Sequence, residues 1–400
     1  MKEKILSIII PTKNREEYLL EVVKNILSIK DNRFELVIQD NSDAQTLQEK
    51  LKVYGFLKDE RLKYFYSVGT LSFVDNFSRG ISNSQGEYII FIGDDDTINP
   101  NIIDVAEWAF KNQIDAITPS LPYVYFWPQT GMDAKIETGR LAISKYKCSI
   151  HFYNPKEELK KLLKNGAQNY LSYNLAKAYH GLVRAIFFDQ IKNITGRYIG
   201  GLSPDIYLSV GLSLLIDKVM VIDYPLTISG ICKKSGSADS VTGKHTGKLE
   251  EAPHFKGHID YCWSKEIPKF YSVETIWGDS AIHAINDINP EFLKYFNFNV
   301  ICAYCLIKYP EFRNIIYENL FTNNNLSKYP KRFNWHLLRG FLSGPGKSTF
   351  FSVYNRVFDR IFNHNKVKIY YNISDINEAM EIIKNDLNKN IFFNINKIIQ

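Results

Sequence analysis

The chain has 400 residues, of which 45% are apolar and 23% charged, and its formal net charge is +6. These values are typical of a folded globular protein, and no run of about 18 apolar residues is present that could cross a membrane. The five cysteines are odd in number and scattered, which argues against a disulfide framework. The apolar run at residues 5–10 is too short for a signal peptide, so the sequence predicts a cytoplasmic protein.

Apolar runs and amphipathic stretches alternate along the first hundred residues. Strands are predicted over residues 6–10, 34–39, 62–67 and 88–92, and helices over residues 16–29, 46–55 and 73–84. Short apolar runs bounded by turn residues are typical of strands that are buried on both faces of a parallel sheet. The order of strands and helices therefore predicts a doubly wound α/β half-sheet.

Three adjacent carboxylates, Asp94, Asp95 and Asp96, follow directly after the predicted strand at 88–92. Adjacent carboxylates repel one another unless a positive charge lies nearby. A divalent cation such as Mg²⁺ or Mn²⁺ fits this need, because it takes oxygen ligands and bridges carboxylates to a substrate diphosphate. The alternative is a solvated acidic turn whose last Asp caps the helix that begins near Pro100.

Polar loops also follow the first two predicted strands. Lys13 and Asn14 come after the first strand, and Asp40 comes after the second. In a parallel sheet both loops open on the same edge as the three carboxylates. Asp40 could accept hydrogen bonds from a base or a ribose hydroxyl, or it could bond to its own backbone in a turn. The first strand lacks a following Gly-x-Gly-x-x-Gly, which argues against dinucleotide binding as in dehydrogenases.

Four segments in this order carry a family resemblance. They are residues 7–15 (Ser-Ile-Ile-Ile-Pro-Thr-Lys-Asn-Arg), residues 37–42 (Val-Ile-Gln-Asp-Asn-Ser), residues 76–81 together with 86–89, and the Asp triplet. With them, residues 1–230 resemble a family 2 glycosyltransferase of the bacterial surface-polysaccharide type. The resemblance implies an α/β GT-A fold, which is Rossmann-like with a mostly parallel central sheet, followed by a largely helical C-terminal region.

The same resemblance implies a set of donor-binding residues. Those for the sugar nucleotide, with UDP as the expected nucleotide, are Pro11, Thr12, Asn14, Asp40, Asn76, Arg79 and Asp94. The Asp-x-Asp motif implies Mn²⁺ or Mg²⁺ on the donor diphosphate, held by Asp94, Asp95 and Asp96. The usual family pattern is Asp-x-Asp-Asp, and Gly93 stands at its first position, so all three carboxylates are kept as metal candidates.

Asp205 is the candidate catalytic base. It follows Ser203 and Pro204, a combination that places an acidic residue just inside a helix start. Family 2 enzymes commonly carry Glu-Asp at this place, with the Asp as base, and here Pro204 replaces the Glu. An inverting sugar transfer needs such a carboxylate to take the proton of the attacking hydroxyl. The alternative is that Asp205 only caps the helix.

A small, polar and basic segment at 228–249 follows the predicted strand at 219–224. Its Lys and backbone N–H groups could close on a diphosphate, and the candidates are Lys233, Lys234, Ser235, Ser237 and His245. A plain flexible linker is the other interpretation.

The domain prediction follows from these features. It comprises a catalytic domain at 1–230, a flexible basic loop at 231–249, a helical addition at 250–325 and a basic helical region at 326–400, while residues 122–153 are expected to be irregular. Residues 326–400 contain twelve Lys or Arg and five Asp or Glu, so they carry +7 and the rest of the chain −1. This predicts peripheral contact with an anionic membrane at its inner face, or else a solvated helical surface. No nucleic-acid partner is expected.

These inferences predict an inverting glycosyltransferase that moves a sugar from a nucleoside diphosphate to a hydroxyl of a saccharide, which a lipid carrier could hold. The alternative is a nucleotidyltransferase, or a non-catalytic nucleotide-binding protein, that uses the same Asp cluster.

Overall fold

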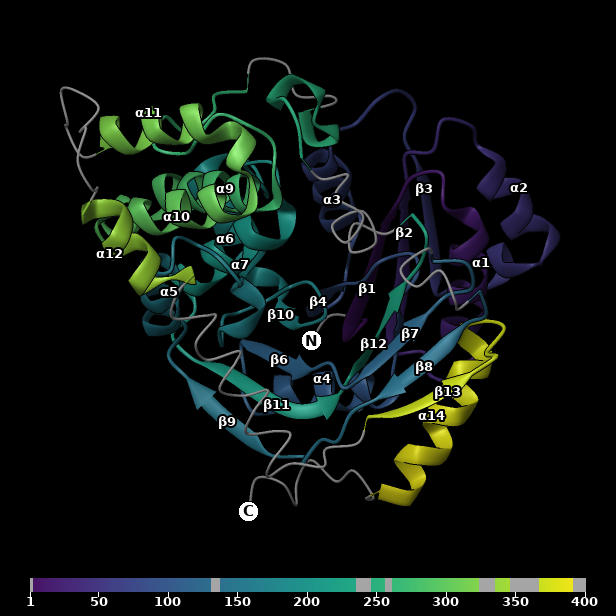
Figure 1. Cartoon of the computed structure of the whole chain (residues 1–400). Helices are drawn as coiled ribbons and strands as arrows, with labels where there is room; N and C mark the ends of the chain where they lie inside the picture. The colour runs from purple at the N-terminus through teal and green to yellow at the C-terminus, as the bar shows by residue number, and fades with distance from the viewer. Residues whose placement is uncertain are drawn as a thin grey trace.

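The fold is built around an eight-stranded sheet in the order β3-β2-β1-β4-β10-β6-β11-β9. The computed structural model describes residues 3–130, 137–234, 246–255, 261–323, 335–345 and 367–390 (Figure 1). The strands of this sheet are β1 (Leu6–Thr12), β2 (Phe34–Asp40), β3 (Leu62–Tyr66), β4 (Tyr88–Phe91), β6 (Ala116–Ser120), β9 (Ile150–Tyr153), β10 (Leu182–Arg184) and β11 (Val219–Pro225).

The sheet is mostly parallel, as the sequence predicts. β1 runs parallel to both β2 and β4, β2 runs parallel to β3, and β6 runs parallel to β11. Only β10 and β9 run against their neighbours. The central strands are buried on both faces, because Ile8 and Ile90 pack into one apolar cluster while Ile9 and Phe91 pack into another on the opposite side. This arrangement explains the continuous apolar runs that identify these strands in the sequence.

Helices cover both faces of the sheet. Those within the first 230 residues are α1 (Glu16–Leu27), α2 (Thr46–Val53), α3 (Phe73–Ser82), α4 (Asn101–Lys111), α5 (Pro155–Lys164), α6 (Ala185–Thr195) and α7 (Pro204–Leu215). Further along come α9 (Val273–Ile288), α10 (Phe298–Lys308), α11 (Arg313–Asn323), α12 (Trp335–Ser343) and α14 (Ile376–Asn390). Short 3-10 helices are η1 (Phe56–Lys58), η2 (Tyr170–Ser172), η3 (Leu249–Glu251), η4 (Pro253–Phe255), η5 (Pro290–Tyr295) and η6 (Pro310–Phe312).

A second, five-stranded sheet corrects the prediction that residues 122–153 are irregular. Its order is β13-β8-β7-β12-β5, with β5 (Thr97–Ile98), β7 (Tyr123–Phe126), β8 (Arg140–Ile143), β12 (Thr227–Ile231) and β13 (Lys368–Tyr371). Tyr123, Tyr125 and Trp127 are buried, whereas the residues between them are partly exposed. This two-residue alternation is a strand signal, and the density of aromatic residues obscures it. β12 also occupies the start of the segment expected to be a flexible loop.

Helices α9, α10, α11 and α12 lie together on one side of the molecule, next to α6 and α7, whereas α14 lies apart from them (Figure 1). α9, α10 and α11 contribute to the apolar cluster that also contains α7. Cys302 and Cys305 lie fully buried in α10, which agrees with structural thiols rather than with metal ligands.

The described residues 367–390 differ from the basic helical region that the sequence predicts for 326–400. β13 pairs with β8, and α14 buries Ile376, Met380 and Ile383 in the cluster that contains α1 (Figure 1). Residues 367–390 contain three Lys and four Asp or Glu, so this part carries −1. Most of the basic residues of the tail lie outside the described residues. Within the described part, no helix combines the length and the apolar character that crossing a membrane requires.

Candidate active site

The three consecutive carboxylates lie at the carboxyl end of β4, between the two sheets. Asp94, Asp95 and Asp96 are each at most 4% exposed. Thr12, the last residue of β1, donates a hydrogen bond from Oγ1 to Asp94 Oδ2 at 2.7 Å. The predicted convergence of the β1 loop and the Asp triplet at one edge of the sheet is therefore observed.

Arg15 supplies positive charge to two of these carboxylates. Its Nη1 lies 3.0 Å from Asp94 Oδ1, and its Nη2 lies 3.0 Å from Asp95 Oδ2. Nη2 also lies 2.8 Å from the Cys232 sulfur, while the Cys232 backbone N–H donates to Asp95 Oδ2 at 3.1 Å. The guanidinium thus bridges the loop after β1, the acidic triplet and the residue that follows β12.

Asp96 points to a different set of partners. It accepts hydrogen bonds from the backbone N–H groups of Gly230, at 2.7 Å, and Gly93, at 2.6 Å. His180 Nε2 lies 3.3 Å from Asp96 Oδ2, and the Tyr179 hydroxyl donates to the same oxygen at 3.2 Å. His180 Nδ1 lies 2.9 Å from Thr227 Oγ1, so the imidazole is held from both sides.

Burial and these partners act in opposite directions on the three carboxyl groups. Burial raises the pKa of Asp94 and of Asp95, and the nearby Arg15 only partly offsets it. Burial also acts to raise the pKa of Asp96, but its interactions with His180 and the backbone N–H groups outweigh burial and lower that pKa. Asp96 is therefore the most firmly ionised of the three.

A divalent cation fits the chemistry of this site but not its present arrangement. Carboxylate oxygens are the ligands that Mg²⁺ and Mn²⁺ prefer. Among the described residues, however, no group of three or more His, Cys, Asp or Glu side chains is arranged to hold a metal ion. Asp94 and Asp95 share a cation, the Arg15 guanidinium, while Asp96 faces His180. A metal on Asp94 and Asp95 would have to replace the guanidinium.

The packing around Gly93 leaves little room for a side chain at this position. A Cβ atom at this residue would lie 2.8 Å from the Tyr179 hydroxyl and 2.9 Å from Asp95 Oδ1. A further carboxylate would not fit here without moving the Tyr179 ring. The triplet begins one residue later, at Asp94.

Gly230 provides the first testable prediction. A Cβ atom at this residue would lie 1.7 Å from the Asp95 carbonyl oxygen, so Gly230→Ala would force β12 away from the triplet. We expect a loss of about 1–3 kcal/mol in the free energy of unfolding, as for an overpacked core. Urea denaturation measures this loss. Ser229→Ala, at the neighbouring and partly exposed position, is the control; an equally small effect of both substitutions would contradict the packing seen here.

Asp205 lies in the first turn of α7 and is partly buried. Burial raises its pKa to about 6, against the opposing influence of His180 and a hydrogen bond with Tyr170, while Asp96 adds to the increase. These interactions show that Asp205 shares its electrostatic environment with Asp96 and His180. Two carboxylates 109 positions apart in the sequence are thus brought to one site.

The candidate nucleotide-binding residues Asn14 and Asp40 are each held by neighbouring residues of the protein. Asn14 has a left-handed φ of 56°, and its Nδ2 donates to Asp43 Oδ2 at 2.7 Å. Asp40 is fully buried and accepts from the Ser42 backbone N–H at 2.8 Å and from the Tyr64 hydroxyl at 2.9 Å. The bond from the Ser42 backbone N–H to Asp40 is the turn interaction that the sequence leaves open as the alternative role of Asp40. Pro11 lies within β1.

The remaining candidates either form hydrogen bonds with neighbouring segments or are exposed. Asn76 is buried on α3 and donates to the Thr12 carbonyl at 3.4 Å, and Arg79 donates to Ser67 Oγ at 2.7 Å. Lys233 is exposed. Lys234 Nζ lies 3.3 Å from the Asn14 carbonyl, which brings the segment after β12 next to the loop after β1. Ser235, Ser237 and His245 lie outside the described residues.

Several residues that contact the triplet have no role predicted from the sequence, among them Arg15, Tyr179, His180 and Cys232. Arg15 belongs to the segment 7–15, on which the family resemblance rests. Its position in that segment is the signal that could have pointed to it. His180 precedes Gly181 and has a left-handed φ of 61°, which is unusual for a residue of this size. Cys232 offers no signal in the sequence, because it reaches the triplet through the pairing of β12 with β5, the strand that directly follows the triplet, and with β7.

Comparison with known proteins gives a family match over the first part of the chain. Residues 7–167 match the family model described as glycosyl transferase family 2. A Campylobacter jejuni protein named GalNAc(5)-diNAcBac-PP-undecaprenol beta-1,3-glucosyltransferase is 31% identical over 98 residues, which are 23% of this chain and 30% of that protein. The Streptococcus pneumoniae glycosyltransferase GlyG is 25% identical over 100 residues, which are 25% of this chain and 33% of that protein.

These similarities cover limited parts of the proteins concerned. The chain covers at most 39% of the length of the seven curated relatives that it matches. Among solved structures, residues 1–349 of Staphylococcus aureus TarS in complex with UDP are 15% identical with a TM-score of 0.43, over 84% of this chain and 94% of that one.

Proposed function

We propose that this protein, whose residues 7–167 match the glycosyl transferase family 2 model, transfers a sugar from a nucleoside diphosphate to a hydroxyl group of a saccharide. The observation that carries this proposal is that Asp205 shares an electrostatic environment with Asp96 and His180 at the carboxyl edge of the sheet. This edge is where ligands bind in open α/β sheets. This proximity supports the assignment of Asp205 to proton removal and of the triplet to the donor side.

The proposed chemistry is an inverting displacement. Asp205 accepts the proton of the acceptor hydroxyl, the resulting oxygen bonds to the anomeric carbon, and the bond from that carbon to the diphosphate oxygen breaks. The leaving group departs as a nucleoside diphosphate. A pKa near 6 suits a general base at neutral pH, because the group is ionised yet more basic than an ordinary Asp.

The donor would lie across the ends of β1, β2 and β4. Asp40, with Pro11, Thr12 and Asn14, would hold the base and ribose, UDP being the expected nucleotide, and Asn76, Arg79 and Lys234 would line the same edge. When bound, Mn²⁺ or Mg²⁺ on Asp94 and Asp95 would supply positive charge to the leaving diphosphate. For Asp40, donor binding requires that a ligand group replace the Tyr64 hydroxyl or share Asp40 with it.

The acceptor is proposed to be a saccharide, and a lipid carrier is compatible with the available similarity. The Campylobacter relative carries undecaprenol in its name, which supports a lipid-linked acceptor for this chain. Peripheral contact with an anionic membrane through the basic part of residues 326–400 remains our proposal on charge alone.

The test is the product formed from a panel of sugar nucleotides with MnCl₂. A glycosyltransferase releases a nucleoside diphosphate slowly even when water is the acceptor, whereas a nucleotidyltransferase consumes or forms pyrophosphate. We expect nucleoside diphosphate release for at least one donor of the panel. Absence of release for all donors, together with absence of thermal stabilisation by any of them, would contradict the proposal.

The pH dependence of donor turnover provides a second prediction. Because Asp205 must be ionised to accept a proton, kcat/KM should fall about tenfold for each pH unit below its pKa of about 6. Turnover measured between pH 5 and pH 8 should therefore be constant above about pH 7 and decline on the acid side. A profile that stays flat down to pH 5 would remove Asp205 from the role of base.

A further inference from the structure

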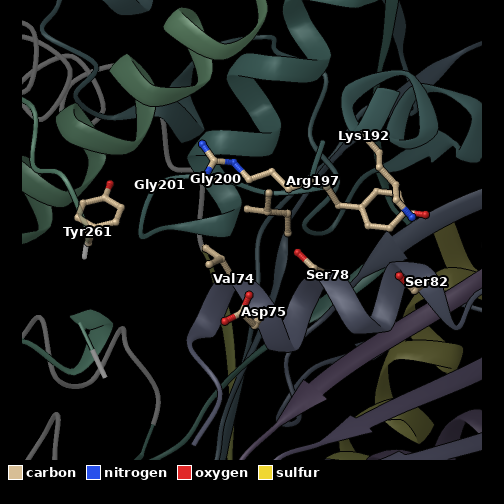
Figure 2. Close-up of a pocket in the computed structure, with 11 residues that line it drawn as sticks. Val74, Asp75, Ser78, Ser82, Lys192, Arg197, Gly200, Gly201 and Tyr261 are labelled. Atoms are coloured by element: carbon tan, nitrogen blue, oxygen red, sulfur yellow. The ribbon is translucent and has the colours of Figure 1, made fainter. Parts of the chain in front are cut away.

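A cavity with a volume of about 330 Å³ lies outside the carboxylate triplet. One wall is a face of α3, and the other is the segment 197–201, which joins α6 to α7, together with Lys192 and Tyr261 (Figure 2). Asp75, Ser78 and Ser82 project from α3 on the side that faces this segment. The volume falls within the range of small-molecule sites.

The cavity stays open where small residues on the two walls face each other. Ser78 and Ser82 are small, and they lie one helical turn apart on the same stripe of α3. Opposite them, Gly200 and Gly201 turn away from the cavity, since a Cβ atom would lie 2.8 Å from the Tyr207 ring or 2.9 Å from the Ser280 Cα atom. At Gly200 and Gly201 the second wall is therefore backbone packed against α7 and α9, while the other residues of this wall contribute side chains to the lining.

This backbone wall is firmly anchored. Ser280 Oγ accepts hydrogen bonds from the backbone N–H groups of both Leu202 and Ser203, each at 3.0 Å. Arg197 Nη2 donates to Asp287 Oδ2 at 2.9 Å, which ties the other end of the wall to α9. The cavity is thus a preformed feature of the fold.

The lining combines donors, acceptors and aromatic rings. Lys192 and Arg197 donate, Asp75 accepts, and the serine hydroxyls do both. Lys192 Nζ lies 4.6 Å from the centre of the Tyr198 ring. Arg197 and Asp75 each bond to a partner within the protein, Asp287 and Ser72 respectively, and keep further capacity for hydrogen bonds. This lining favours a polar ligand, and Asp75 opposes a ligand that is purely anionic. A saccharide matches the lining, because its hydroxyls both donate and accept while its C–H faces suit aromatic rings.

The cavity also lies near the proposed base. Gly201 precedes Asp205 by four residues, so their Cα atoms are at most about 14 Å apart even if this segment were fully extended. On the other wall, the same first turns of α3 carry Asn76, which contacts the Thr12 carbonyl at the donor edge. The cavity is therefore lined by elements that also carry Asn76, proposed for the donor, and lead into the first turn of α7, which carries Asp205.

We propose that this cavity binds a saccharide unit of the acceptor, and this inference rests on the proposed function. The bound unit would position the acceptor chain so that its reacting hydroxyl reaches Asp205. The segment 197–201 and Tyr261 then act as acceptor-binding elements, a role that the sequence analysis does not assign to them.

The test combines a substitution that fills the cavity with a binding measurement on simple sugars. Ser78→Trp places a large ring between the two walls, whereas Asn193→Trp, at an exposed position on α6 outside the lining, is the control. The probes are the methyl glycosides of glucose, galactose, N-acetylglucosamine and N-acetylgalactosamine. Binding is measured by saturation-transfer NMR with UDP present, and hydrolysis of the sugar nucleotide is measured in parallel.

We expect at least one glycoside to bind the wild type and Asn193→Trp, and to lose its signal with Ser78→Trp. Donor hydrolysis should be unchanged in all three proteins. Lys192→Ala, which removes a donor without filling the cavity, should weaken binding about fivefold, the value of one typical hydrogen bond. Glycoside binding that survives Ser78→Trp, or no binding to a wild type that hydrolyses donor, overturns the inference; a wild type that hydrolyses no donor contradicts the proposed function instead.

Discussion

Replacing Asp205 by Asn is expected to lower kcat for sugar transfer by about 10²–10⁴-fold, the usual contribution of a general base. The amide keeps the size of the side chain but cannot accept the proton of the attacking hydroxyl. Donor affinity should be preserved, because the proposed donor contacts lie at the ends of β1, β2 and β4. Turnover assays and calorimetric titration with the donor measure the two effects separately.

The same substitution should increase the stability of the protein, although it lowers the activity. The pKa of Asp205 is raised to about 6 in the folded protein, above the ordinary value of 3.8, so the folded state disfavours the ionised form. The free energy of unfolding therefore decreases as the pH rises from 3.8 to about 6, and it stays at the lower value above that pH. A neutral amide removes this penalty, so Asp205→Asn should raise the thermal midpoint at pH 8.

This combination separates a base from a helix cap. If Asp205 only capped α7, the substitution would leave turnover nearly unchanged and would not raise stability. Asp217→Asn is the matched control, because it makes the same change at an exposed position just after the end of α7, where Asp217 pairs with Lys156. Only small effects are expected there. Equal turnover in both variants would exclude Asp205 as the base.

The central sheet is predictable from the sequence because its signals are local. The strand around residues 6–10 has apolar side chains on both faces, and its burial in two separate clusters requires them. The helix predicted at 73–84 likewise begins at Phe73, where Ser72 caps it by accepting a hydrogen bond from the Asp75 backbone N–H at 3.1 Å. Each of these features depends on neighbouring residues alone.

The second sheet is less accessible to sequence analysis because its pairings are distant. β13 pairs with β8 across more than two hundred residues, and nothing local in the segment 368–371 indicates this partner. The docking of α14 on α1 is of the same kind, with Asn377 Nδ2 donating to Glu21 Oε2 at 2.8 Å. Local patterns predict the elements, while their partners across the chain depend on the complete fold.

The candidate site likewise has one part that local sequence patterns predict and another part that depends on the complete fold. The sequence points to the Asp triplet because carboxylates directly after a buried strand are conspicuous, and to Asp205 through the family resemblance at its position. It does not show which cation neutralises the triplet, since Arg15 and His180 reach it from separate parts of the chain. The initial argument that three carboxylates require a positive charge is therefore correct, but the protein itself supplies part of that charge.

Arg15→Gln is expected to destabilise the metal-free protein by about 3–5 kcal/mol, the cost of removing one partner from a buried ion pair. Asp94 and Asp95 are at most 4% exposed and would lose the cation that bridges them. Lys13→Gln is the control. It removes the same charge two residues away, but Lys13 forms only an exposed pair with Asp43 at 3.4 Å, which contributes about 0–1 kcal/mol.

Manganese should then distinguish the two variants. If a divalent cation occupies the place between Asp94 and Asp95, it competes with the guanidinium in the wild type and meets no competitor in Arg15→Gln. Without nucleotide, MnCl₂ should therefore raise the thermal midpoint of Arg15→Gln more than that of the wild type or of Lys13→Gln. Calorimetric titration should show the same order of Mn²⁺ affinities. Tighter Mn²⁺ binding by the wild type than by Arg15→Gln would mean that the guanidinium does not occupy the metal position, and that the ion, if it binds, is held elsewhere.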